Sequence, residues 1–187
     1  MTGTAELRPA VFLDRDGTLN EERHYLYRRE DWVWIPGVVD SLARLSAAGF
    51  ALVVVTNQSG IARGMYARED VDVLHAWVQE DLLLRAGIRF EGFYVCPHHP
   101  DFSGECQCRK PGPGMLLMAA AEHGLDLSAS WMIGDKSADV LAGRAAGCRT
   151  VLVQSGYGKM EKDKVAGVAD IVAADFAAAT DVILRCV

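Results

Sequence analysis

Two acidic residues, separated by a single position, follow a short apolar run near the start of the chain. The run is Ala10–Leu13, and Asp14 and Asp16 come directly after it. If side chains alternate along an extended chain, both carboxylates point the same way, and such a pair needs a cation, a shared proton or strong solvation. The simpler alternative is an Asx-type turn that closes a strand. The pair therefore predicts a charged site or a turn, and the motifs below favour the site.

Polar side chains also follow other apolar runs of the chain. Thr56 ends one run, Arg109 and Lys110 come just before an expected helix, and Asp135 and Lys136 follow a third run. Together these positions supply carboxylates for a metal, a hydroxyl for an anion, and cations. Such a set suits phosphoryl transfer, in which catalysis is mostly positioning and charge stabilisation.

A second group of residues has the spacing of a metal site. Cys96 and His98 are followed by Cys106 and Cys108, all in one irregular loop. Four soft or borderline ligands in one loop fit a closed, structural tetrahedral zinc site, with His99 in place of His98 as the alternative. The alternative without metal is a set of ordinary loop thiols. We expect the zinc to brace the loop that carries Lys110.

Apolar runs alternate with helical patterns along the chain, which predicts an α/β fold with a doubly wound parallel sheet. The expected strands are Ala10–Leu13, Ala51–Thr56, Gly92–Cys96, Trp131–Ile133, Thr150–Val153 and Asp170–Val172. The expected helices are Val38–Ala48, Arg68–Ala86, Gly114–His123, Ser137–Ala146 and Phe176–Arg185. Ligands of such sheets bind beyond the carboxyl ends of the strands, where the polar motifs fall.

Size and composition predict a small enzyme domain. The 187 residues suffice for one domain, 1–187, with the zinc loop 96–108 inside it and no separate cap domain. The formal net charge of −6 argues against nucleic acid or a membrane as partner. Met1–Pro9 shows no signal-peptide pattern and no apolar run is long enough for a membrane span, so we expect a cytoplasmic location. We also expect a monomer that acts on a small molecule.

The polar motifs, taken in order, resemble the four signatures of the haloacid dehalogenase-like (HAD) phosphatase superfamily. These are Asp-x-Asp-x-Thr, a strand-terminal Ser or Thr, a Lys, and Gly-Asp-x-x-x-Asp. The resemblance implies that Asp14 is the nucleophile and Asp16 the general acid and base. It also implies that Mg²⁺ is held by Asp14, Asp135 and the backbone carbonyl of Asp16, and that Thr56 and Lys110, with Arg109, hold the phosphoryl oxygens.

Asp139 ends the last signature, and its role stays open. It could orient Lys136, hold a metal-bound water, or serve as an acid near the positive end of a helix.

Longer segments resemble one family within that superfamily, the D-glycero-β-D-manno-heptose-1,7-bisphosphate 7-phosphatases. These segments are Phe12–Asn20, Val54–Gly64, Cys96–Pro100, Cys106–Pro111 and Pro113–Leu116. The resemblance implies removal of the 7-phosphate to give heptose 1-phosphate, a step toward the nucleotide-activated heptose of lipopolysaccharide. The run Glu21–Tyr25 matches loosely, and the stretch between His99 and Cys106 is short for that family.

Three other functions compete with this interpretation. Histidinol-phosphate phosphatases share the superfamily motifs and a similar zinc loop. A polynucleotide 3′-phosphatase shares the superfamily core, but the chain shows no extended basic face. A zinc-braced binding module without catalysis would explain the cysteines alone.

Without a cap domain, loops must shape the pocket, and we expect them to contact the substrate. Arg63 and Arg109 are candidates for the distal phosphate, because arginine offers a planar fork of donors, although Arg63 could equally be a solvated surface cation. Trp32 and Trp34 could stack on a sugar, but their alternation favours a short strand packed on the core. The predicted substrate contacts are Glu22, Arg23, His24, Tyr25, Asn57, Gln58, Ser59, Arg63, Arg109, Lys110 and Lys136.

Overall fold

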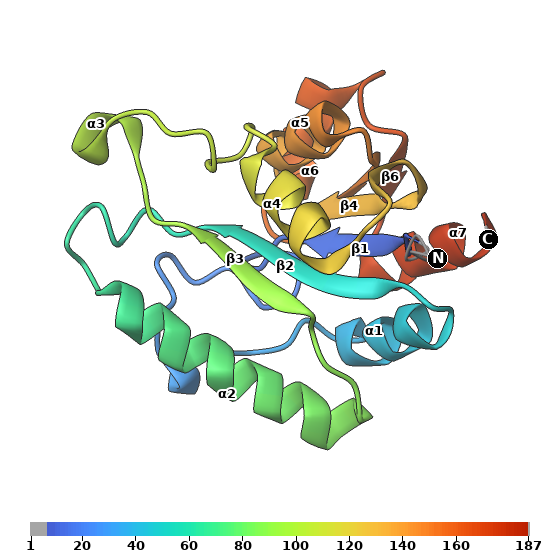
Figure 1. Ribbon diagram of the computed structural model, residues 1–187, viewed down its shortest axis with the longest axis horizontal. Helices are drawn as coiled ribbons and strands as arrows, with labels where there is room; N and C mark the ends of the chain where they lie inside the picture. The colour runs from blue at the N-terminus through green and yellow to red at the C-terminus, as the bar shows by residue number, and fades with distance from the viewer. Residues whose placement is uncertain (1–6, 187) are drawn as a thin grey trace, which may run out of the picture.

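The computed structural model describes residues 7–186, which form a six-stranded parallel sheet flanked by helices (Figure 1). The strand order is β3-β2-β1-β4-β5-β6. This confirms the expected α/β fold with a doubly wound parallel sheet. The strands are β1 (Ala10–Leu13), β2 (Ala51–Asn57), β3 (Gly92–Cys96), β4 (Trp131–Gly134), β5 (Arg149–Val153) and β6 (Ile171–Ala173).

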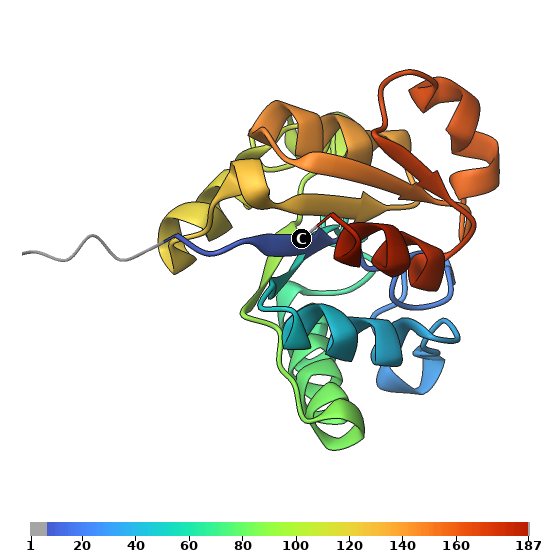
Figure 2. The same ribbon diagram turned by 90° about the vertical axis from the view of Figure 1, so that its right-hand side faces the viewer.

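The sheet is covered on both faces, and this explains why its central strands are apolar throughout. Helices α1, α2 and α7 pack on one face, and α4 and α5 pack on the other (Figures 1 and 2). In β1, Val11 and Leu13 belong to the first core and Ala10 and Phe12 to the second. These helices are α1 (Val38–Ala47), α2 (Arg68–Ala86), α4 (Gly114–His123), α5 (Ser137–Ala146) and α7 (Phe176–Leu184).

The expected elements differ from the structure in two ways: some boundaries shift, and the shortest helices were not predicted. Several expected boundaries shift by one residue, as in β2, which continues to Asn57. Short helices that the sequence did not predict are α3 (Pro100–Ser103), α6 (Gly158–Glu161) and the 3₁₀ segments Arg29–Asp31, Leu127–Ala129 and Lys162–Val165. One helical turn contains too few residues for an apolar period to be visible. In residues 7–186 no helix has the length and apolar character that a membrane span needs.

Trp32 and Trp34 lie on the core, as expected, but not in a strand. Trp32 is buried, and Trp34 packs against the same core. Trp34 makes only an isolated bridge to Asn20, and its indole N–H donates to Asp81 of α2 at 2.7 Å. The expected short strand was therefore wrong, because the extended residues after the 3₁₀ segment pair at this one bridge and not along their length. The signal-peptide expectation concerns Met1–Pro9, of which residues 1–6 lie outside the described part of the chain.

The strand order decides which motifs meet. In the sheet, β1 lies between β2 and β4, with Leu13 opposite Val54 and Ile133. Parallel strands end at the same edge, so the residues that follow these three strands are neighbours there. The long loop after β3 returns to this edge and delivers Lys110.

Candidate active site

A buried lysine joins two of the acids at the carboxyl edge of the sheet. Lys110 Nζ lies 2.7 Å from Asp14 Oδ1 and 2.6 Å from Asp139 Oδ1, and it donates to the carbonyl of Val55 at 2.8 Å. Burial alone would lower the pKa of Lys110, but the charges of Asp139 and Asp14 outweigh it and raise the pKa. Lys110 is therefore a fixed cation beside the carboxylate of Asp14.

Asp135 supplies an oxygen that the protein leaves without a partner. Its Oδ2 accepts from the backbone N–H of Tyr157 at 2.8 Å, while its buried Oδ1 has no hydrogen-bond partner among the described residues. Gly17 and Gly156 crowd the same carboxylate so closely that a Cβ at either position would overlap it. Burial, and then the charges of Asp14 and Asp139, raise the pKa of Asp135 to about 8.

Asp14, Asp135 and Asp139 together fit a hard cation. Each is buried and offers a carboxylate oxygen, and these oxygens lie within 4.8 Å of one another. Such oxygen ligands suit Mg²⁺, and a cation there would partner the orphaned Oδ1 of Asp135. The donor set thus fits the magnesium that the superfamily resemblance implies.

Asp139 has two contacts that the sequence could not place. Its Oδ2 accepts from the backbone N–H of Lys136 at 2.9 Å, closing the first turn of α5, and its Oδ1 faces Lys110. Burial, and then the charge of Asp14, raise its pKa to about 6. The residue is 1% exposed, so this acid in the first turn of α5 is buried.

Asp16 is held by three neighbouring side chains. Its carboxylate accepts from Arg15 Nε at 3.1 Å, from Asn20 Nδ2 at 3.1 Å and from Gln58 Nε2 at 3.0 Å. Burial opposes ionisation, but Arg15 and these hydrogen bonds outweigh it and hold the pKa of Asp16 below its usual range. Gln58 also donates to the hydroxyl of Thr56 at 2.8 Å, which links the first two motifs.

A hollow of about 210 Å³ opens above these residues. Seven of the predicted substrate-contact residues line it, and so does Asp16. Lys136 on its wall lies 3.4 Å from Glu22 Oε2 and 4.8 Å above the ring of Tyr157. Burial would lower the pKa of Lys136, but the negative charges of Asp14 and Asp135 outweigh this effect and raise the pKa. The lining residues are Asp16, Glu22, His24, Tyr25, Asn57, Gln58, Ser59, Tyr66, Lys136 and Tyr157.

A smaller hollow of about 40 Å³ adjoins it, and the two share Asp16, Asn57 and Lys136. Asp14, Thr56, Lys110 and Asp139 also line the smaller hollow. The structure therefore brings the candidate nucleophile, the hydroxyl and the lysine to one small space.

The three predicted arginines are not among the residues that line the larger hollow. Arg23 is exposed and pairs with Glu21 at 3.0 Å. Arg63 is exposed, approaches His99 Nε2 at 3.2 Å and stacks 4.4 Å above the ring of Phe102. Arg109 donates to the carbonyl of His98 at 2.9 Å and lines a separate surface hollow beside the cysteine loop.

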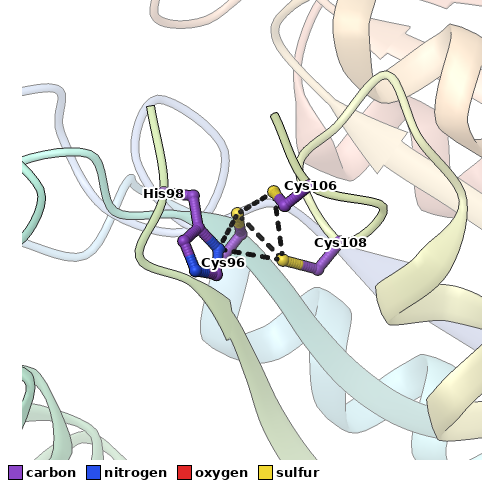
Figure 3. A group of neighbouring side chains, drawn as sticks. All are labelled: Cys96, His98, Cys106 and Cys108. Carbon is purple, nitrogen blue, oxygen red and sulfur yellow. Dashed lines mark hydrogen bonds between the residues drawn. The ribbon is translucent and has the colours of Figure 1, made fainter. Parts of the chain in front are cut away.

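The cysteine loop gathers four potential metal ligands (Figure 3). Cys108 Sγ lies 3.2 Å from Cys96 Sγ, 3.4 Å from Cys106 Sγ and 3.4 Å from His98 Nδ1. A tetrahedral zinc site with Zn–S bonds of about 2.3 Å would separate its sulfurs by roughly 3.8 Å, so the cluster needs little expansion to hold the ion. His98, and not the alternative His99, faces the sulfurs (Figure 3).

Sequence reasoning missed several residues of the site. Arg15 is fully buried, and its guanidinium holds Asp16 and approaches His75 of α2. Tyr66 donates to Gln58 at 2.8 Å, and the backbone of Tyr157 holds Asp135. The position of Arg15, between two acids at the end of a strand, could have indicated that it belongs to the site. His75 and Tyr66 had none, because only the tertiary fold brings them near the site.

Comparison with known proteins defines the class first. Residues 107–179 match the family model described as HAD-hydrolase-like. A solved structure, the D,D-heptose 1,7-bisphosphate phosphatase from B. bronchiseptica complexed with magnesium and phosphate, superposes with a TM-score of 0.86 at 32% identity. It covers 96% of this chain and 99% of that one. The fold and the buried acids with their lysine thus define a HAD-like hydrolase.

Sequence relatives narrow the class to one family. The D-glycero-beta-D-manno-heptose-1,7-bisphosphate 7-phosphatase of Yersinia pestis is 49% identical over 154 residues, which are 79% of this chain and 81% of that protein. The D-glycero-D-manno-heptose-1,7-bisphosphate 7-phosphatase of Thermosynechococcus vestitus is 44% identical over 185 residues, which are 93% and 94% of the two chains. The chain belongs to the heptose-1,7-bisphosphate 7-phosphatase family, and this confirms the resemblance drawn from its motifs.

Proposed function

We propose that the protein removes the 7-phosphate of D-glycero-D-manno-heptose 1,7-bisphosphate and leaves heptose 1-phosphate. The observation that carries this proposal is Lys110, fixed between Asp14 and Asp139 at the floor of a small hollow. Family membership supports the choice of substrate. The product belongs to the synthesis of nucleotide-activated heptose, and we place the enzyme in the cytoplasm, where that synthesis would use it.

The residues divide the reaction between them. A carboxylate oxygen of Asp14 attacks phosphorus while the bond to the sugar oxygen breaks. Asp16 has a lowered pKa in the free protein, so it must first take up a proton as the anionic substrate binds beside it, and it gives this proton to the sugar oxygen. The sugar leaves as a neutral alcohol, and the phosphoryl group stays on Asp14. Asp16, now a carboxylate, takes a proton from water as this water attacks the phosphorus, which releases phosphate and restores Asp14.

Lys110 and Thr56 act on the transferred group. Lys110 lies beside Asp14, so its positive charge reduces the repulsion between a carboxylate and a phosphate dianion. The Thr56 hydroxyl lines the same hollow and can donate to a phosphoryl oxygen. Both groups are buried and already oriented, so little reorganisation is needed during the reaction.

Mg²⁺ would be held by Asp14, Asp135 and the backbone carbonyl of Asp16. The unpartnered Oδ1 of Asp135 supports this assignment. When bound, the ion supplies charge stabilisation for the phosphoryl oxygens. Asp139 lies close enough to be a further ligand, directly or through water.

Zinc would be held by Cys96, His98, Cys106 and Cys108 as a structural ion. Four protein ligands leave no open position for chemistry. The last ligand stands two positions before Lys110, so the ion would brace the segment that delivers the lysine. Arg109 supports the same loop through the carbonyl of His98, and its role in binding the distal phosphate remains part of the proposal.

The test is phosphate release with product identification. With Mg²⁺, the protein should release one phosphate per heptose 1,7-bisphosphate, and ³¹P NMR should show that the remaining phosphate is the anomeric one. Both anomers, fructose 1,6-bisphosphate and histidinol phosphate serve as competing substrates. A kcat/KM for histidinol phosphate above that for both heptose anomers would contradict the proposed substrate.

A further inference from the structure

Arg15 is a fully buried cation whose guanidinium is held from several directions. It is 0% exposed. Its Nε donates to Asp16 Oδ2 at 3.1 Å and its Nη2 to Asp16 Oδ1 at 3.0 Å, so the fork engages both carboxylate oxygens. Nη2 also donates to the carbonyl of Leu26 at 2.6 Å. The remaining Nη1 contact is with Nε2 of His75, at 3.2 Å.

The contact with Arg15 determines the tautomer of His75. A guanidinium only donates hydrogen bonds, so Nε2 of His75 must be the acceptor and the ring proton must lie on Nδ1. The ring is 4% exposed and stacks on Phe93 of β3 at 4.5 Å. Burial, and then the charge of Arg15, lower the pKa of His75 well below its usual value, which agrees with a neutral ring.

Packing of the ring alone does not account for a histidine at this position. Its Nδ1 is buried and has no hydrogen-bond partner among the described residues. An apolar ring would stack on Phe93 equally well and would not bury an unsatisfied N–H group. The one feature that an apolar ring lacks is the acceptor that faces Arg15.

We propose that His75 is a positioning residue that acts through Arg15 to hold the carboxyl group of Asp16 in the orientation for proton transfer. Asp16 lines both hollows of the site, and both of its carboxylate oxygens accept hydrogen bonds from Arg15. Without the acceptor on His75, one edge of the guanidinium has no fixed partner, and the fork can rotate away from Asp16. This inference depends on the general acid role that the proposed function gives to Asp16.

Two substrates with different leaving groups can separate positioning from general damage. Release of a sugar alcohol needs the proton from Asp16, whereas p-nitrophenolate leaves without one. In His75→Phe, which keeps the stacked ring, kcat for heptose 1,7-bisphosphate should fall about tenfold more than kcat for p-nitrophenyl phosphate, with KM nearly unchanged.

Matched variants control for the fold. His75→Gln can place an oxygen near the position of Nε2 and should restore most of kcat, whereas His75→Asn is one methylene shorter and should not. His123→Phe makes the same change at a histidine whose ring meets that of Tyr94 edge to face, away from the site, and should match the wild type. If His75→Phe does not fold by circular dichroism, the Gln and Asn pair gives the same comparison.

The outcomes distinguish this inference from the proposed function. Equal losses on the two substrates, or no loss in a folded variant, would overturn the role of His75 alone. A wild type inactive on heptose 1,7-bisphosphate but active on another sugar phosphate would overturn the proposed substrate, and the same ratio is then measured with that ester. A wild type that hydrolyses no sugar ester would overturn both.

Discussion

Lys110 Nζ lies 2.7 Å from Asp14 Oδ1, although the two residues are 96 positions apart in the chain. Asp14 follows the central strand, and Lys110 comes at the end of the cysteine loop. Cys108, a member of the metal-type cluster, stands two positions before the lysine. The candidate zinc site and the candidate phosphoryl site are therefore joined by the short segment from Cys108 to Lys110.

Replacement of Lys110 should remove most activity without unfolding the protein. Lys110→Met keeps the aliphatic stem but leaves Asp14 and Asp139 without their shared cation. We expect kcat to fall by about 10²–10³-fold, the range for loss of one preorganised charge at a reacting oxygen. Steady-state kinetics and circular dichroism measure the two effects. Activity within about threefold of the wild type would contradict the role of this lysine.

Loss of the zinc ligands should reduce activity through the loop. Purified protein should contain about one zinc per chain. In Cys108→Ser, zinc content, melting temperature and kcat should all fall, because the segment before Lys110 is no longer anchored. Cys186→Ser, at an exposed cysteine outside the cluster, is the control and should match the wild type. Active, carefully purified protein without zinc would contradict this prediction.

Magnesium affinity should depend on pH through Asp135. Its pKa is raised to about 8, so without metal its carboxyl group holds a proton at neutral pH. A bound cation must displace that proton, and the apparent affinity should therefore rise with pH and level off above about 8. Titration of activity with Mg²⁺ at several pH values measures this. An affinity that is constant from pH 6 to pH 8, or that falls over this range, is incompatible with the assignment.

Asp139→Asn tests whether the charge of Asp139 matters or only its place at the helix start. The amide can still accept from the backbone N–H of Lys136, so α5 should keep its first turn. Loss of a negative charge beside the candidate cation site should weaken Mg²⁺ binding about tenfold. Asp126→Asn, at an acid that caps a distant 3₁₀ segment, is the control. Unchanged Mg²⁺ affinity in Asp139→Asn would contradict a role in cation binding and leave the helix-capping contact and the ion pair with Lys110.

The sequence predicted the sheet and the motif residues because their signals are local. An apolar run followed by a polar residue, as at Asp14, Thr56 and Asp135, predicts both a strand and a site residue at its end. Parallel pairing of the strands then brings these ends together. The partners of the motif residues depend on the tertiary fold. The sequence left Asp139 open between orienting Lys136, holding a metal-bound water and serving as an acid near the positive end of a helix. Its ion pair with Lys110 arises only when the loop after β3 folds back.

His75 shows the limit of sequence reasoning most clearly. It lies in the middle of α2, where a histidine has no distinctive local pattern. Only the packing of α2 on the sheet brings its ring to Arg15. Arg63 and Arg109 show the same limit. Their residue type predicted phosphate contacts, which stay a prediction, but it did not indicate their contacts with His99 and with the carbonyl of His98.

The most direct test of the account is to trap the phosphoryl group on the protein. Acid-quenched enzyme, taken during turnover of heptose 1,7-bisphosphate with Mg²⁺, is treated with borohydride, which reduces an aspartyl phosphate to homoserine. Peptide mass spectrometry should find homoserine at position 14, only when substrate is present, and never in Asp14→Asn. Trapping at another residue, or phosphate release by Asp14→Asn at the wild-type rate, would contradict the assignment of Asp14 as nucleophile.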